Sequence, residues 1–267
     1  MASRCRRPDG TALALVLVCA ALPAVRAEDV PMCPATPLVA IPSASSNNVR
    51  LVTGAPYSAL GTSETVITLA DGSRVVRQNL IRQWRDSDGR TRSEISLSSI
   101  GGSSGGSPQV ELNTTVTVID DPAARLRYVL QPGEKVALTI PIVPCRTDTG
   151  SREPDLSVGP PRPAKLPIKV SPPVTLGERR LDGETVAGRR IEATIPAGAM
   201  GNSQPIRMSA EQWYGRDLQV VIEATYRDPR TGETRYRLSD IDRAEPDASL
   251  FKVPNNYRRE ASPPPKK

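Results

Sequence analysis

Short runs of β-branched residues, separated by turn-forming residues, constrain the fold of this chain more than any other feature. Between residues 49 and 143 these runs are VRLVTG, TVITLA, RVVRQNLIRQW, TRSEISLSSI, TVTVID, RLRYVLQ and KVALTIPIV. Their length and composition favour strands over helices. A second series of the same kind follows between residues 174 and 257. We therefore predict a mainly β protein with a curved antiparallel sheet and a few short helical turns.

Proline and glycine divide the chain into segments. Residues 144–173 hold eight prolines, too many for a helix or a central strand, and predict a linker between a first β-rich half (49–143) and a second (174–257). Residues 28–48 are expected to form an extended lead-in, and residues 258–267, which end in SPPPKK, a disordered tail. The GGSSGGS segment at 101–107 predicts a flexible insert, because no Gly-Lys-Ser/Thr follows it as a phosphate-binding loop would require.

The first 27 residues have the layout of a secretory signal peptide. Arg4, Arg6 and Arg7 precede the apolar run TALALVLVCAALPAV, and a small residue, Ala27, stands before Glu28. This order predicts cleavage between Ala27 and Glu28 and export to the periplasm or the cell exterior. The apolar run is shorter than the roughly 20 residues that span a bilayer, so no stable membrane span is expected after cleavage.

Two cysteines, Cys33 and Cys145, remain after this cleavage. In an oxidising compartment two such thiols are more often paired than free, so we predict a disulfide between them. Closing a loop of this length would stabilise the fold by roughly 4 to 5 kcal/mol in the chain-entropy model. Two separate thiols in proline-rich flanks are the alternative.

A charged string occurs twice, as RDSDGRTRSE at 85–94 and as RDPRTGETRYR at 227–237. Asp-Gly in the first, and Pro229 with Gly232 in the second, predict a hairpin at each place. LADGSR at 69–74 and LDGE at 181–184 carry the same signal. We favour shared turn chemistry over duplication, since the flanking residues do not align, and expect exposed, weakly paired arginines and aspartates. A rim of these charges around a ligand mouth is the alternative.

The residues needed for common catalytic chemistry are missing. The chain contains no histidine, which excludes Ser-His-Asp and Cys-His machinery and a zinc site with imidazole ligands. Of two carboxylate pairs, Asp120-Asp121 stands before Pro122 in ordinary turn composition, and neither it nor Asp240-Asp242 has the spacing of a calcium loop. We predict no catalytic residue, no cofactor, no metal site and no enzymatic activity.

The charge of the chain gives little support to a nucleic-acid partner. Removing residues 1–27 takes away four arginines and one aspartate, which lowers the formal net charge from +6 to +3. The remaining arginines are interspersed with acids and do not form the basic stripe with interleaved aromatic residues that is typical of a nucleic-acid binder. No nucleic-acid partner is therefore expected.

Several strings occur in an order that indicates a family. They are GAPYSA at 54–59, RDSDGRTR at 85–92, TIPAG at 194–198, EQWY at 211–214 and AEPD at 244–247. Over nearly all of 54–257 the chain resembles a family of uncharacterised exported bacterial proteins. More distantly, the succession of strands, Asp-Gly turn, hairpin and closing Leu-Phe-x-Val-Pro is similar to lipoprotein-carrier (LolA/LolB-like) proteins. That similarity implies a half-barrel, a curved antiparallel sheet over a hydrophobic cavity.

The closing segment EPDASLFKVP predicts a single helical turn. Asp247 is placed to cap Ala248 to Phe251, and the turn should stop before Pro254. Phe251 is the only phenylalanine of the chain, and we expect its ring to plug the open face of the sheet.

Two functions follow, and the sequence leaves both open. In the first, an exported non-enzymatic envelope protein binds a lipid, a lipoprotein segment or another apolar ligand on a half-open sheet. Its sign would be a cavity of a few hundred Å³ lined by aliphatic side chains. In the second, a structural or interaction protein of the envelope has a filled core, binds no small ligand and contacts a protein partner. A solid core and an unpaired edge strand would indicate the second.

Overall fold

The computed structural model describes residues 48–97, 101–102, 114–145 and 167–262. Within these ranges the chain consists of strands, turns and one 3-10 turn, which confirms the predicted mainly β fold. The strands are β1 Asn48–Arg50, β2 Tyr57–Thr68, β3 Arg74–Arg85, β4 Thr91–Leu97, β5 Gly101–Gly102, β6 Thr114–Asp121, β7 Leu126–Gln131, β8 Val136–Pro141, β9 Val143–Cys145, β10 Lys169–Val170, β11 Val174–Leu181, β12 Glu184–Ile195, β13 Ile206–Gly215, β14 Val220–Asp228, β15 Gly232–Asp242 and β16 Arg258–Ala261. The 3-10 turn η2 is Ala248–Phe251. No helix in the described part of the chain is long and apolar enough to cross a membrane.

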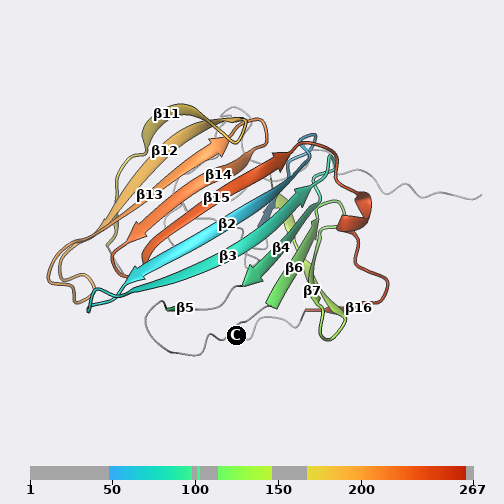
Figure 1. Cartoon of the computed structure of the whole chain (residues 1–267), viewed down its shortest axis with the longest axis horizontal. Helices are drawn as coiled ribbons and strands as arrows, with labels where there is room; N and C mark the ends of the chain where they lie inside the picture. The colour runs from blue at the N-terminus through green and yellow to red at the C-terminus, as the bar shows by residue number, and fades with distance from the viewer. Residues whose placement is uncertain (1–47, 98–100, 103–113, 146–166, 263–267) are drawn as a thin grey trace, which may run out of the picture.

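Both β-rich halves belong to one open, curved sheet (Figure 1). Its order is β10-β12-β13-β14-β15-β2-β3-β4-β6-β7-β8-β16, with β11 also on β12 and β5 also on β3. The halves meet where β15 pairs with β2, from Glu233 opposite Val66 to Asp242 opposite Ser58. Neighbouring strands of this sheet are antiparallel except β8 and β16, which run parallel. A separate parallel pair, β1 with β9, forms a second small sheet.

The alternation of side chains along β3 shows how one face of the sheet is buried. Ile81 and Gln83 are buried, whereas Leu80 and Arg82 between them are exposed. Successive residues of a strand point to opposite faces of the sheet. The residues paired with Ile81 and Gln83 on the neighbouring strands therefore lie on the same, buried face. The buried Gln83 accepts a hydrogen bond from the Tyr57 hydroxyl at 3.1 Å and donates one to the Tyr236 hydroxyl at 3.2 Å. Hydrogen bonds therefore satisfy these polar groups inside the core.

All four predicted hairpins are present. Asp182 and Gly183, with φ of 49° and 81°, form the two-residue turn between β11 and β12. Gly72, Gly89 and Gly232 also have positive φ in the turns that follow β2, β3 and β14. Glycine and Asp-Gly pairs tolerate this backbone region, which is why they identified the hairpins from sequence.

The predicted linker, tail and insert have different boundaries in the structure. Pro144, assigned to the linker, lies in β9, and Lys169–Val170, near the linker's end, form β10 against β12. The tail predicted from residue 258 instead begins with β16, which pairs with β8. Gly101 and Gly102 of the predicted insert pair with β3 as β5. In each case a strand distant in sequence supplies the backbone partners, so local composition gave no sign of the pairing.

Two apolar clusters fill the described fold. The first combines residues of both halves: Tyr57, Ile81, Val186, Trp213, Leu218, Ile222, Tyr236 and Leu238. The second gathers Ile119, Tyr128, Leu130, Ala137, Phe251 and Val253. As predicted, Asp247 caps η2 by accepting a hydrogen bond from the Ser249 amide at 2.7 Å. Phe251 is 4% exposed, which confirms that its ring is buried against the sheet.

Candidate binding groove

An open groove of about 930 Å³ lies at the end of the sheet where β2 turns into β3. Charged and polar side chains dominate its lining. The lining residues are Glu64, Val66, Ile67, Thr68, Arg74, Glu192, Ala193, Thr194, Arg207, Met208, Ser209, Arg227, Asp228, Pro229, Arg230, Gly232, Glu233 and Arg235. This composition differs from the cavity of Val, Ile and Leu expected for an apolar ligand.

Strand register puts the floor of the groove on one face of the sheet. Glu192 is opposite Ser209, Ser209 opposite Arg227, Arg227 opposite Glu233, and Glu233 opposite Val66. Residues directly opposite each other in a ladder project to the same face. These five side chains therefore form one row that crosses β12, β13, β14, β15 and β2.

Two arginines flank this row one step closer to the strand ends. Arg207 is opposite Thr194 and two residues before Ser209, while Arg74 is opposite Thr68 and two residues before Val76. Ser209 belongs to this row. Val76 continues the row into β3, because it is opposite Val66. The turn of the β14–β15 hairpin, residues 229–231, lies between the two arginines.

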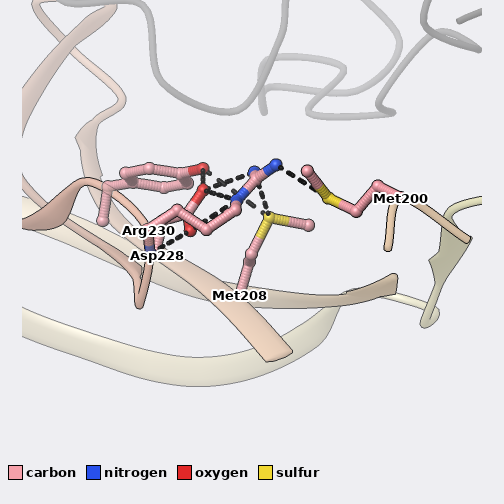
Figure 2. A network of polar contacts seen from close by, with 5 residues as sticks. Met200, Met208, Asp228 and Arg230 are labelled. Atoms are coloured by element: carbon pink, nitrogen blue, oxygen red, sulfur yellow. Dashed lines mark hydrogen bonds and ion pairs between the residues drawn. The ribbon is translucent and has the colours of Figure 1, made fainter. Parts of the chain in front are cut away.

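The hairpin is held by a compact polar network (Figure 2). Asp228 is 3% exposed and accepts hydrogen bonds from the Arg230 amide at 2.9 Å, from Nε at 2.9 Å and from Nη2 at 2.6 Å. The same guanidinium lies 3.2 Å from Sδ of Met208 and 3.8 Å from Sδ of Met200. The hydroxyl of Tyr226 donates to Asp228 at 3.2 Å. These contacts fix the hairpin at the edge of the groove.

Most charges in the groove already have a partner. Glu233 accepts from Arg227 at 2.9 Å and from Arg235 at 2.5 Å, and Glu64 accepts from Gln78 at 2.8 Å. By contrast, the side chains of Arg74 and Arg207 make no ion pair or hydrogen bond with any residue that the structure describes. Among the described residues, the groove therefore keeps two guanidinium groups without a side-chain partner, one on β13 and one on β3.

The two charged strings are more buried than predicted. Arg85, Asp86 and Asp228 are 5%, 1% and 3% exposed, so the prediction of exposed, weakly paired groups is wrong for these three. Asp86 accepts from the Arg90 amide at 2.8 Å and from its Nε at 2.5 Å. Each aspartate thus caps its own turn and forms an ion pair with an arginine of that turn. Turn composition alone did not predict this burial and pairing.

The strings occupy opposite ends of the sheet. Arg85 is opposite Tyr57, the first residue of β2, whereas Glu233 of the second string is opposite Val66 near its end. Only the second string lines the groove, with Arg227, Asp228 and Arg230. Only the second string therefore places arginine and aspartate at the groove, as the alternative of a charged rim expected. The two strings resemble each other because each forms a turn capped by its own aspartate.

Three of the four carboxylates considered for chemistry have structural partners. Asp120 accepts from Arg127 at 2.6 and 2.9 Å, and Asp121 caps the Ala124 amide at 2.9 Å. Asp240 has a positive φ of 53°, and Asp242 caps the Ala244 amide at 2.9 Å. No group of three or more possible metal ligands occurs among the residues that the structure covers.

The remaining predicted sites involve the N-terminal segment. Ala27, Glu28 and Cys33 lie outside the described residues, so cleavage and the disulfide stay predictions. Cys145 is 3% exposed at the end of β9, where its carbonyl accepts from the Leu51 amide at 2.8 Å. The groove arginines Arg74 and Arg207 were not singled out from sequence, because only strand pairing brings them to one end of the sheet.

The ion pair at the hairpin predicts a defined pH dependence. Hydrogen bonds from Arg230 hold the pKa of Asp228 below its ordinary value despite burial. Such a carboxylate stabilises the fold above its unfolded-state pKa, near 3.9, and this contribution is lost as the pH falls through the lower folded-state pKa. We expect Asp228→Asn to reduce the free energy of unfolding by about 1 to 3 kcal/mol at pH 7.

Urea unfolding of both proteins between pH 7 and pH 2 measures this contribution. The gap between wild type and Asp228→Asn should stay constant down to about pH 4 and then narrow. A gap that is the same at every pH would show that the ionised form of Asp228 adds nothing.

No protein-family model and no curated protein matches the chain. Solved structures with a similar fold include an uncharacterised conserved protein from Thermus thermophilus (9% identity, TM-score 0.38, covering 78% of this chain and 91% of that one). Another is a LolA superfamily protein from Nitrosomonas europaea (9% identity, TM-score 0.31, covering 76% and 92%). A third is the lipoprotein LppX from Mycobacterium tuberculosis (11% identity, TM-score 0.28, covering 72% and 90%).

These structural neighbours thus include one LolA superfamily protein and one lipoprotein, both at low identity. With TM-scores below 0.5 they carry no argument about the ligand of this protein. The resemblance to a family of exported bacterial proteins has no matching family model and stays a prediction.

Proposed function

We propose that this chain is an exported, non-enzymatic binding protein of the cell envelope that holds a segment of a partner polypeptide in the groove. The observation that carries the proposal is the open groove of about 930 Å³, whose charged floor crosses five strands. A long, open and polar surface suits an extended peptide, which offers both backbone polar groups and side chains along its length.

An apolar ligand fits the described groove less well. Five arginines and four carboxylates line it, and an acyl chain laid over them would remove their hydration without offering hydrogen bonds. Many of the buried apolar side chains instead pack against one another in the two clusters of the core. This favours the interaction hypothesis over the lipid hypothesis.

The groove carboxylates support a binding role over a catalytic one. Burial raises the pKa of Glu233, but hydrogen bonds from Arg235 and Arg227 outweigh it and keep the pKa below its ordinary value. The pKa of Asp228 is lowered by Arg230. A general acid or base works best with a pKa near the working pH, and both shifts go the other way.

Export predicts a definite mature chain. When the full-length gene is expressed in a bacterium with an envelope, we expect the protein outside the cytoplasm to begin at Glu28 and to lack the mass of residues 1–27. A Cys33–Cys145 disulfide would lower the mass by a further two hydrogens before reduction. Intact-mass spectrometry with and without a reductant measures both; an uncut chain in the cytoplasm would contradict the export prediction.

Filling the groove should weaken peptide binding strongly. Ser209 lies at the centre of the floor, so Ser209→Trp is expected to weaken binding of fluorescein-labelled, unstructured ten-residue peptides of random sequence at least tenfold in fluorescence polarisation. Thr62→Trp is the matched control, since Thr62 is exposed on β2 outside the groove lining.

The same preparations also test the lipid hypothesis. Mass spectrometry of extracts from the purified protein should find no lipid in stoichiometric amount. A bound lipid together with no detectable peptide binding would overturn the proposed function.

A further inference from the structure

We propose that the groove selects an extended peptide with two acidic side chains about six residues apart, one held by Arg207 and the other by Arg74. This inference rests on the proposed polypeptide-binding function and names the chemistry of the bound segment. It follows from which charges of the groove are free, how far apart they lie, and what separates them.

The first step is the supply of free cations. Arg227 and Arg235 share Glu233, and Arg230 is held by Asp228. Arg74 and Arg207 are exposed in the groove lining and contact no acid among the residues that the structure describes. A guanidinium presents a planar fork of donors that matches the two oxygens of a carboxylate, so each free arginine is a carboxylate site.

The second step is the spacing of the two arginines. Arg207 is on β13 and Arg74 is on β3, and the order β13-β14-β15-β2-β3 puts four strand spacings between them. Neighbouring strands lie about 4.8 Å apart, so the two positions are separated by about 19 Å across the sheet. An extended chain advances about 3.3 Å per residue, which makes this distance equal to about six residues. A shorter acidic motif would reach one arginine but not both.

The third step is the charge between the two sites. Glu233 on β15 and Glu64 on β2 line the groove between β13 and β3, whereas Glu192 on β12 lies just beyond Arg207 and forms no ion pair with another described residue. A ligand with negative charge along its whole length, such as a nucleic acid, would meet these carboxylates and be repelled. A peptide with isolated acids at its two ends and neutral residues between them avoids this repulsion.

The placement of the two arginines on strands β13 and β3 explains why the peptide should cross the strands. Residues 229–231 lie between the two arginines, and Asp228, Arg230 and Met208 hold this turn in place. A segment that follows the row of Ser209, Arg227 and Glu233 passes beside the turn and brings its ends toward β13 and β3. Recognition is therefore through side chains on the face of the sheet, in contrast to addition of a strand at its edge.

The test uses four fluorescein-labelled, N-acetylated and C-amidated nine-residue peptides of serine, threonine and valine. The first has glutamate at its second and eighth positions, and the second has both glutamates adjacent at its centre. The third has glutamine and the fourth lysine in place of the glutamates of the first. Binding to the full mature protein is measured by fluorescence polarisation in 50 mM salt, where charge interactions are weakly screened.

We expect the spaced glutamate peptide to bind at least tenfold more tightly than the glutamine and lysine peptides, and at least threefold more tightly than the adjacent one. The double variant Arg74→Gln with Arg207→Gln should bind the spaced glutamate peptide at least tenfold more weakly than wild type. Arg77→Gln with Arg82→Gln changes the net charge equally on exposed residues of β3 outside the lining and should leave binding within twofold. Urea unfolding of both double variants confirms that they are folded.

Each outcome bears on a different claim. If the glutamine peptide binds as tightly as the spaced glutamate peptide, or if the groove variant binds like the control variant, the two-carboxylate inference is wrong and polypeptide binding stands. If none of the four peptides binds, the proposed function itself is overturned, and the two-carboxylate inference is wrong as well.

Discussion

Replacing Phe251 with alanine is expected to lower the free energy of unfolding by about 3 to 5 kcal/mol, the range for removal of a buried phenylalanine side chain. The ring is 4% exposed and packs with Ile119 and Tyr128, and the Arg90 guanidinium lies 5.5 Å from its centre. Alanine would leave a cavity between η2 and the sheet. Urea unfolding followed by tryptophan fluorescence measures the loss, since Trp84 packs against the same cluster.

The effect should extend to the C-terminal strand. β16 follows η2 and pairs with β8 over only four residues, from Arg258 to Ala261. In Phe251→Ala, amide hydrogens of β16 should exchange faster than in wild type, and this increase should be larger for β16 than for β12 or β13. Leu69→Ala is the control, because Leu69 is 47% exposed, and should stay within about 0.5 kcal/mol of wild type. A loss below about 1 kcal/mol for Phe251→Ala would show that the ring does not anchor the segment.

Gly232→Ala is expected to destabilise the protein by about 2 to 5 kcal/mol, the sum of backbone strain and overpacking. Gly232 has φ of 91°, and a Cβ built there would lie 2.1 Å from the carbonyl oxygen of Val66. No side-chain rotation relieves this contact, because Val66 contributes a backbone atom. The β14–β15 hairpin would have to move away from β2, at the place where both line the groove. Thermal or urea unfolding measures the change in stability.

Gly72→Ala separates the two causes of this loss. Gly72 has φ of 82° in the neighbouring turn, but a Cβ there would meet no heavy atom within 4 Å. Only the strain of a left-handed alanine remains, about 1 to 2 kcal/mol. Equal losses for the two variants would show that the contact with Val66 contributes nothing.

Local features of the fold were predictable because their causes are local. Asp182-Gly183 identified its turn through the positive φ that these residues tolerate, and Asp247 identified the start of η2 through its capping carboxylate. The runs of β-branched residues marked the strands in the same way. Such signals depend on a few neighbouring residues and are therefore readable without the rest of the structure.

The candidate site was predictable only in part. One alternative drawn from the sequence was a rim of arginine and aspartate around a ligand mouth. Arg227, Asp228 and Arg230 do line the groove. The burial of Asp86 and Asp228 was missed, since an aspartate in a turn has the same local sequence whether it is exposed or covered. Arg74 and Arg207 were missed as well, because they are 133 residues apart and ordinary strand residues in their own contexts.

The amino-acid sequence by itself determined that the chain forms strands and where most of the turns fall, because backbone preference and side-chain alternation act over a few residues. Tertiary structure alone decided that β15 pairs with β2, that β16 returns to β8 and that distant arginines share one groove. Pairing of distant strands depends on which faces bury their apolar side chains together, and that free energy belongs to the assembled sheet.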